Sequence, residues 1–263
     1  MIPGRPSPAV MRFFDRYVDR YLRRQFHRVH LWGQPERADE AARQPRLFVV
    51  SHTSWWDVLV GYVLARRLVG GSNYAPMDEA QLVRYRILSR LGVYSVDRGS
   101  TRGLREFLAY TTSLLREGGA VWITPQGEFT SARRRPIRFQ SGIGHLVRRV
   151  NGVAVRPVAV AYEFLEEPRP EIFVKFGPPR VFPEGTDPRR VTFQLERDLE
   201  AEMDALDAVL VARDLSPFTP LLEGRTSVSL VYDRVRRVRA WLRGMPDPAR
   251  HGDLVSDPRR SRP

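Results

Sequence analysis

The chain has 263 residues, of which 42% are hydrophobic and 10% aromatic, a composition that is typical of a folded protein and excludes wholesale disorder. It has no cysteine, so disulfides, thiolate metal sites and a cysteine nucleophile are excluded. The formal net charge is +13, and every basic residue except Lys175 is an arginine. An arginine bias partly reflects codon composition, but such a surface also attracts anions: nucleic acid, anionic lipid headgroups or a polyphosphorylated cofactor.

No stretch reaches the roughly 18 apolar residues that a membrane-spanning helix needs, and no signal peptide opens the chain. We therefore expect a cytoplasmic protein that is soluble or bound peripherally to a membrane. The length suffices to bury a sizeable core, either in one large α/β domain or in two small ones.

The first predicted element is an amphipathic basic helix over Val10–Leu31, because apolar residues recur at helical spacing with arginines between them. The apolar positions are Phe13, Phe14, Tyr17, Val18, Tyr21, Leu22, Phe26 and Val29. Such a helix packs on the domain with an ordinary solvated face or lies in a membrane interface, and the two interpretations are compatible. His27 and His30 would share one face of it at metal-ligand spacing, but no acidic or histidine partner accompanies them, so we expect no metal site.

The middle of the chain alternates short apolar runs with helical patterns. Strands are predicted at Leu47–Ser51, Asn73–Pro76, Val93–Val96, Ala120–Thr124, Ala154–Tyr162 and Glu171–Phe176. Helices are predicted at Val58–Leu68, Glu79–Leu91, Leu104–Arg116 and Ile143–Val150. This alternation is typical of an α/β fold, a layered domain with a largely parallel central sheet flanked by helices.

Past Pro178 the pattern becomes helical. An acidic helix is predicted over Val191–Ala212 and a basic one over Val228–Leu242. The stretch from Pro246 combines several prolines and charges with little apolar content, and we expect it to be disordered.

A histidine and a carboxylate flank the junction between the first of these strands and the helix after it. The strand over Leu47–Ser51 runs directly into His52, and Asp57 follows at the start of the next helix. Open α/β sheets place their sites at the carboxyl ends of strands. On a continuous helix the two residues would lie about 140° apart. A bend between strand and helix lets Asp57 accept the imidazole N–H and leaves the other ring nitrogen free to take a proton.

Alone, this pair is a weak indication, because a strand-end histidine is often structural. Four further blocks follow it in order: GVYSVDR at Gly92–Arg98, TPQGEFT at Thr124–Thr130, FQSGIGHL at Phe139–Leu146 and VRPVAV at Val155–Val160. The whole series, from about Phe48 to Tyr162, resembles the glycerolipid acyltransferase superfamily of the lysophosphatidate acyltransferase type.

The resemblance implies direct acyl transfer, in which His52, oriented by Asp57, deprotonates a lipid hydroxyl that attacks the thioester of acyl-CoA or acyl-carrier protein. It implies no cofactor besides this co-substrate. The partners that it implies are membrane lipid and the acyl thioester donor, acyl-carrier protein included, and not nucleic acid. The implied substrate-binding residues are Arg98, Pro125, Gln126, Gly127, Glu128, Phe129 and Thr130. Backbone N–H groups of the Gly127 loop and of the helix near Ser141 would hold an oxyanion or a phosphate.

Several residues of the first and third blocks depart from the family pattern. Ser51 replaces an asparagine, Gln126 a glutamate, Glu128 a threonine and Phe129 an arginine. That glutamate and arginine are associated in the family with binding the glycerol phosphate of the acceptor. We therefore expect an acceptor other than lysophosphatidate: another lysophospholipid, a glycolipid or a glycosylated isoprenoid lipid. Arg98 would keep one phosphate contact, and the arginines at 133–135 would either compensate or form a solvated basic loop.

These patterns divide the chain into a membrane-associating segment (1–45), an acyltransferase core (46–180), a helical C-terminal part of the same domain (181–245) and a disordered tail (246–263). We expect peripheral attachment to the cytoplasmic face of the cell membrane.

Trp55 and Trp56 either pack in the core or contact the acyl chain or the membrane. A non-catalytic lipid-binding protein of the same fold is the alternative function. Nucleic-acid binding would explain the charge, but no motif supports it.

Overall fold

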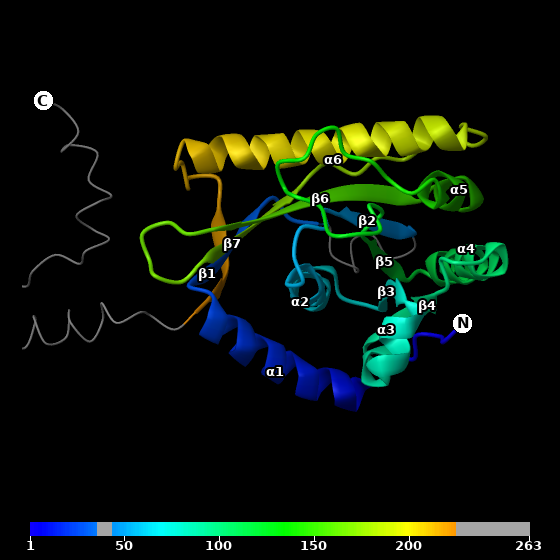
Figure 1. The fold of residues 1–263 in the computed structure, drawn as a ribbon, viewed down its shortest axis with the longest axis horizontal. Helices are drawn as coiled ribbons and strands as arrows, with labels where there is room; N and C mark the ends of the chain where they lie inside the picture. The colour runs from blue at the N-terminus through cyan, green and yellow to red at the C-terminus, as the bar shows by residue number, and fades with distance from the viewer. Residues whose placement is uncertain (36–43, 225–263) are drawn as a thin grey trace, which may run out of the picture.

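The computed structural model describes residues 1–35 and 44–224 and contains one eight-stranded sheet with helices on both faces (Figure 1). The strands are β1 (Arg28–Trp32), β2 (Arg46–Val50), β3 (Asn73–Asp78), β4 (Val93–Val96), β5 (Ala120–Ile123), β6 (Ala154–Glu163), β7 (Glu171–Phe176) and β8 (Thr219–Glu223). The helices are α1 (Pro8–Gln25), α2 (Asp57–Leu64), the π-helix η1 (Ala65–Val69), α3 (Glu79–Arg84), the 3-10 helix η2 (Arg86–Leu91), α4 (Thr101–Arg116), α5 (Gly142–Arg149) and α6 (Pro188–Val211).

The sheet is parallel over most of its width. Its strand order is β4-β3-β5-β2-β6-β7-β1-β8, and β2 pairs in parallel with both β5 and β6. The antiparallel pairs are β6 with β7 and β1 with β8. The α/β fold class predicted from the alternating pattern is therefore confirmed.

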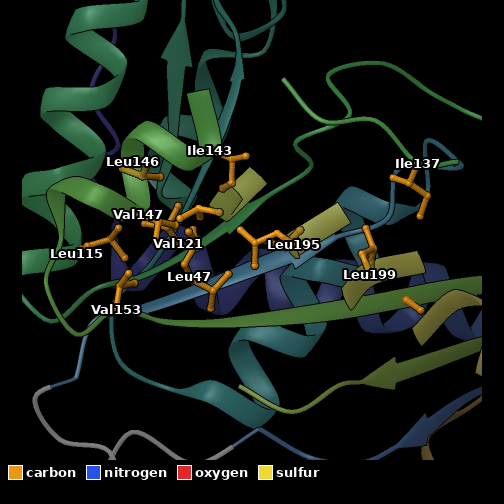
Figure 2. Packing of buried hydrophobic residues seen from close by; sticks show 14 of the residues in the cluster. Leu47, Leu115, Val121, Ile137, Ile143, Leu146, Val147, Val153, Leu195 and Leu199 are labelled. Atoms are coloured by element: carbon orange, nitrogen blue, oxygen red, sulfur yellow. The ribbon is translucent and has the colours of Figure 1, made fainter. Parts of the chain in front are cut away.

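The central strand β2 shows why the domain has three layers. All five of its residues are buried, as expected of a parallel strand covered on both faces. Leu47 and Val49 point into the apolar cluster under α4, α5 and α6, where Figure 2 shows Leu47 near Val121. Phe48 and Val50 point to the opposite cluster, which includes Val18 and Leu22 of α1 and several residues of α2. Because side chains alternate along a strand, one continuous apolar run supplies both cores.

Most predicted elements are confirmed within a few residues, but the first helix is shorter than predicted. It ends at Gln25, and residues 28–31 of the predicted helix belong to strand β1, which lies between β7 and β8. Residues 29–31 are all buried within the sheet. Their backbone groups pair with β7 in place of the hydrogen bonds that a helix would form. As a result, β1 belongs to the same sheet as the strands of the predicted core.

Two other regions differ from the prediction. The helix predicted over Glu79–Leu91 breaks at Tyr85, whose φ of −117° and ψ of 52° are not helical, and forms α3 and η2. Strand β8 has no counterpart among the predicted elements; it lies at the edge of the sheet, where a proline such as Pro220 is tolerated. The predicted helix Val228–Leu242 and the tail from Pro246 lie outside the described residues.

Candidate active site

His52 and Asp57 lie at the carboxyl end of β2, where the chain turns from the sheet into α2. Ser51 anchors the turn: its N–H donates to the Val158 carbonyl and its hydroxyl accepts the Val160 N–H, each at 3.0 Å. The chain then turns so that His52 Nδ1 comes within 3.2 Å of Asp57 Oδ2. The bend between strand and helix thus brings together two side chains that a continuous helix would keep apart.

The Asp57 carboxylate is held from every side. Oδ2 also accepts the backbone N–H groups of Thr53, at 2.7 Å, and Ser54, at 2.8 Å. Oδ1 accepts the hydroxyl of Tyr162, from the end of β6, at 2.5 Å. The Asp57 side chain is only 1% exposed, so these bonds replace water as the partners of the buried charge.

Tyr162 is suited to remain a donor. Burial, together with the nearby Asp57 carboxylate, raises the pKa of the Tyr162 hydroxyl well above its usual value of 10. The phenol therefore stays protonated at neutral pH. Sequence reasoning missed Tyr162, because a tyrosine at a strand end has no local signal, and the contact spans 105 residues of the chain.

The His52 ring has one nitrogen committed and one available. Because Nδ1 faces a carboxylate, the single N–H of the neutral imidazole is at Nδ1. Nε2 then carries the free lone pair. Within residues 1–35 and 44–224, Nε2 makes no hydrogen bond, and the side chain is 16% exposed. The Phe129 ring lies beside the imidazole, with ring centroids 4.3 Å apart and planes tilted by 42°. This arrangement can accept a proton from a hydroxyl that reaches the exposed edge of the ring.

The Gly127 loop is bonded directly to the His52 backbone. The Gln126 side chain accepts the His52 N–H at 2.7 Å and donates its amide N–H to the Thr130 hydroxyl. The Thr130 N–H donates to the His52 carbonyl at 2.9 Å. Gln126 and Thr130 thus hold His52 against the loop, while Glu128 and Phe129 between them are exposed.

Arg98 links two neighbouring strand ends to the same loop. Its guanidinium donates to the Gly127 carbonyl and lies 3.7 Å from the Asp78 carboxylate at the end of β3. The buried Pro125 accepts the Gln140 N–H at 2.8 Å through its carbonyl. The Gly127 N–H, a predicted oxyanion donor, donates instead to the Thr124 carbonyl at 3.1 Å. It is therefore used inside the turn.

Comparison with known proteins agrees with this geometry. Residues 33–161 match the family model described as Acyltransferase, and they include His52, Asp57, Arg98 and the Gly127 loop. The part of the chain that holds the candidate site is therefore similar to the acyltransferase family. Its fold resembles the crystal structure of the 1-acyl-sn-glycerophosphate (LPA) acyltransferase PlsC from Thermotoga maritima, with a TM-score of 0.51 and 16% identity over 75% of this chain and 80% of that one. No curated protein matches the chain.

The arginines that follow the loop are not equivalent in this structure. Arg135 donates to Asp204 of α6 at 2.6 Å and 2.8 Å, which ties it to the helix layer. Because its guanidinium is paired with Asp204, Arg135 is not placed to replace the phosphate contact of the family's arginine. Arg133 and Arg134 are exposed.

The two histidines near the N-terminus of the chain do not share a helix face. His30 lies in β1, where it is buried and stacked on Phe173, and its Nε2 is 2.5 Å from the Glu171 carboxylate. His27 follows the end of α1. Among the described residues, no group of three or more His, Cys, Asp or Glu side chains could hold a metal ion.

The two tryptophans beside the candidate site differ in burial. Trp56 packs against Phe26, with ring centroids 4.8 Å apart, and against Tyr21 at 5.4 Å. Trp55 is exposed beside it. Trp56 therefore belongs to the packing between α1 and α2, while Trp55 is open to a ligand or a membrane. In the described part of the chain, no helix is both long and apolar enough to cross a bilayer.

Proposed function

We propose that this acyltransferase moves a fatty acyl group from acyl-CoA or acyl-carrier protein to a hydroxyl of a lysophospholipid or another lipid acceptor, with His52 as general base. The observation that carries the proposal is the His52–Asp57 pair, in which Nδ1 faces a fully bonded carboxylate and Nε2 is open. This is the arrangement that a base needs in order to take a proton and be stabilised as an imidazolium.

The reaction needs no covalent enzyme intermediate. His52 Nε2 takes the proton as the acceptor oxygen attacks the thioester carbonyl, and Asp57 stabilises the imidazolium that forms. Collapse of the tetrahedral intermediate breaks the carbon–sulfur bond, and the imidazolium proton passes to the departing thiolate. General-base help of this kind is typically worth about 10²–10⁴ in rate. Ser51, the serine next to the base, is fully buried with its hydroxyl bonded to the Val160 N–H, which disfavours it as a nucleophile.

The surroundings of His52 favour an acceptor without a phosphomonoester. Phe129 occupies the position of the family's arginine and places an apolar ring, 57% exposed, beside the base. Arg98 already donates to the Gly127 carbonyl and faces Asp78. A phosphomonoester needs paired, charge-assisted donors, and an aromatic ring cannot supply them. We propose another lysophospholipid, a glycolipid or a glycosylated isoprenoid lipid as the acceptor.

Helix α1 supports the proposal of peripheral attachment to the cytoplasmic face of the membrane. One face of it is buried against α2 through Val18 and Leu22. On the other face Phe13 is 72% exposed and Tyr17 is 50% exposed, and the exposed basic residues around them are Arg12, Arg16, Arg20, Arg23 and Arg24. The helix thus packs on the domain and still presents a basic, aromatic face suited to anionic lipid.

The chemical proposal is tested with a thiol-release assay using acyl-CoA and acyl-carrier protein donors and a panel of lysolipids. We expect His52→Ala to lower turnover at least a hundredfold while leaving folding and vesicle binding intact. His145→Ala, at an exposed histidine on α5, is the matched control and should keep full activity. Near wild-type turnover of purified His52→Ala would refute the mechanism. Absence of thiol release from the wild type with every donor and acceptor would favour the non-catalytic lipid-binding alternative.

The same assay tests the acceptor. We expect lysophosphatidate to be a poor acceptor of the wild type, and the double variant Phe129→Arg, Gln126→Glu to improve it. The glutamate keeps an oxygen for the His52 N–H, and the Thr130 hydroxyl can donate to it, so the loop is preserved. Phe193→Arg, at an exposed phenylalanine on α6, controls for the added charge. If lysophosphatidate is the most efficient acceptor of the wild type, the specificity proposal fails.

A further inference from the structure

The α3–η2 segment exposes apolar side chains next to arginines. Val83 is 57% exposed, Ile87 59% and Tyr85 47%, whereas a folded domain normally buries valine and isoleucine. Leu82 and Leu91 are buried and anchor the segment to the domain. The exposed apolar side chains therefore belong to an element that is packed against the rest of the domain.

The same segment carries a local positive charge. Arg84, Arg86 and Arg90 are exposed, and residues 80–91 contain no acidic residue. Within the described parts of the chain, these three arginines form no ion pair. The Arg84 guanidinium lies 5.3 Å from the centre of the Tyr85 ring. Alternating apolar and arginine side chains on one exposed segment are typical of a surface that enters the interface of an anionic bilayer.

The segment lies between α1 and the candidate active site. At one end, the backbone N–H groups of Arg5 and Ser7 donate to the carbonyls of Ser89 and Arg90, each at 2.8 Å, immediately before α1 begins. Figure 1 shows α3 beside the N-terminal end of α1, on the side of the sheet that also carries α2. Helix α1 and the α3–η2 segment are therefore neighbours.

The other end of the segment leads to the catalytic pair. Asp78 precedes α3 and accepts the Ala80 N–H at 3.1 Å. The Asp78 carboxylate lies 3.7 Å from Arg98, which donates to the Gly127 carbonyl of the loop that holds His52. Any surface bound by the start of α3 is therefore close to the edge of the sheet at which His52 lies.

We infer that α3–η2 is a second membrane contact, which rests on the proposed attachment through α1. The side chains of Val83, Tyr85 and Ile87 enter the bilayer interface, and the three arginines bind the phosphates of anionic headgroups. A single amphipathic helix leaves the protein free to rotate about the helix axis. A second contact beside it removes this freedom and holds the His52 edge toward the membrane, where the lipid acceptor resides.

The test measures binding to phosphatidylglycerol–phosphatidylcholine vesicles by sedimentation. Because Val83 and Ile87 are exposed, Val83→Asp with Ile87→Asp should fold normally and bind at least tenfold more weakly. The affinity for the vesicles should fall roughly fivefold per arginine, and its salt dependence should decrease, in the triple variant Arg84→Gln, Arg86→Gln, Arg90→Gln. Val211→Asp with Phe193→Asp, at exposed positions on α6, is the control and should bind like the wild type.

A parallel variant, Phe13→Asp with Tyr17→Asp, separates this inference from the attachment proposal. If the α1 variant leaves the vesicles and both α3–η2 variants bind like the wild type, the second contact is refuted and attachment through α1 stands. If the wild type itself does not bind, both proposals fail. A lower rate of the arginine variant with acyl-carrier protein but not with acyl-CoA, at unchanged vesicle binding, would instead assign the segment to the carrier protein and overturn the inference.

Activity provides a second readout. The α3–η2 variants should acylate a short-chain lysophospholipid below its critical micelle concentration at the wild-type rate, because no residue of the segment touches His52. Their rate on an acceptor embedded in vesicles should fall in parallel with binding. Equal rates on the embedded acceptor would contradict a role in orienting the protein.

Discussion

Asp57→Asn removes the charge of the catalytic pair with little change of shape. In the wild type, Oδ2 accepts three N–H groups and Oδ1 accepts the Tyr162 hydroxyl. The asparagine oxygen can replace Oδ2 and still accept from Thr53 and Ser54. Its amide nitrogen then faces Tyr162, whose oxygen can accept a hydrogen bond. We therefore expect the fold and substrate binding to survive while the imidazolium loses its counter-charge.

The size of the effect follows from the 3.2 Å separation of Nδ1 and Oδ2. With the charge centres about 4 Å apart and an effective dielectric constant of about 20, the attraction is about 4 kcal/mol. This corresponds to roughly a thousandfold in rate. Since the His52 side chain is 16% exposed, solvent screening reduces the value, and we expect kcat to fall about 10²–10³-fold with little change in KM.

The assay is steady-state thiol release, with circular dichroism and a urea midpoint to establish folding. Asp214→Asn, at an exposed carboxylate in the turn after α6, is the matched control and should keep wild-type kcat. A loss of less than tenfold in folded Asp57→Asn would refute the reasoning, because the carboxylate would then not stabilise the charged form of His52.

Two other predictions concern tyrosines. Tyr162→Phe removes one hydrogen bond to the Asp57 carboxylate, and such a bond to a charged group is worth about 1.5–3 kcal/mol. We therefore expect a lower urea midpoint than in the wild type and a smaller loss of kcat than in Asp57→Asn. Unchanged kcat and stability would contradict a positioning role for Tyr162. Burial raises the pKa of Tyr94 above its usual value of 10, so its neutral form is favoured in the folded state. This contribution to stability is complete below about pH 10 and is lost as the pH rises further. The free energy of unfolding, measured with urea, should therefore decrease less from pH 9 to pH 11 in Tyr94→Phe than in the wild type. Equal decreases in the two proteins would contradict a contribution from Tyr94.

The sequence determined the parts of this protein that depend on local pattern. Continuous apolar runs such as residues 47–50 predict strands buried on both faces, and their alternation with helical patterns predicts a largely parallel sheet. The same logic placed His52 at a strand end and Asp57 at the following helix start, because a bend of a few residues there is a short-range property. Periodicity alone did not place the end of α1, since residues 29–31 suit a helix face and a strand equally well.

The tertiary structure decided which groups surround the catalytic pair. Tyr162 reaches Asp57 only because β6 lies beside β2, and Gln126 reaches the His52 backbone only because β5 lies on the other side. Arg98 is committed to the Gly127 carbonyl, although its position in the chain suggested a phosphate ligand. These contacts join residues far apart in the chain. They depend on strand order and register, which follow from packing the whole sheet between its helix layers and leave no mark on the neighbouring sequence.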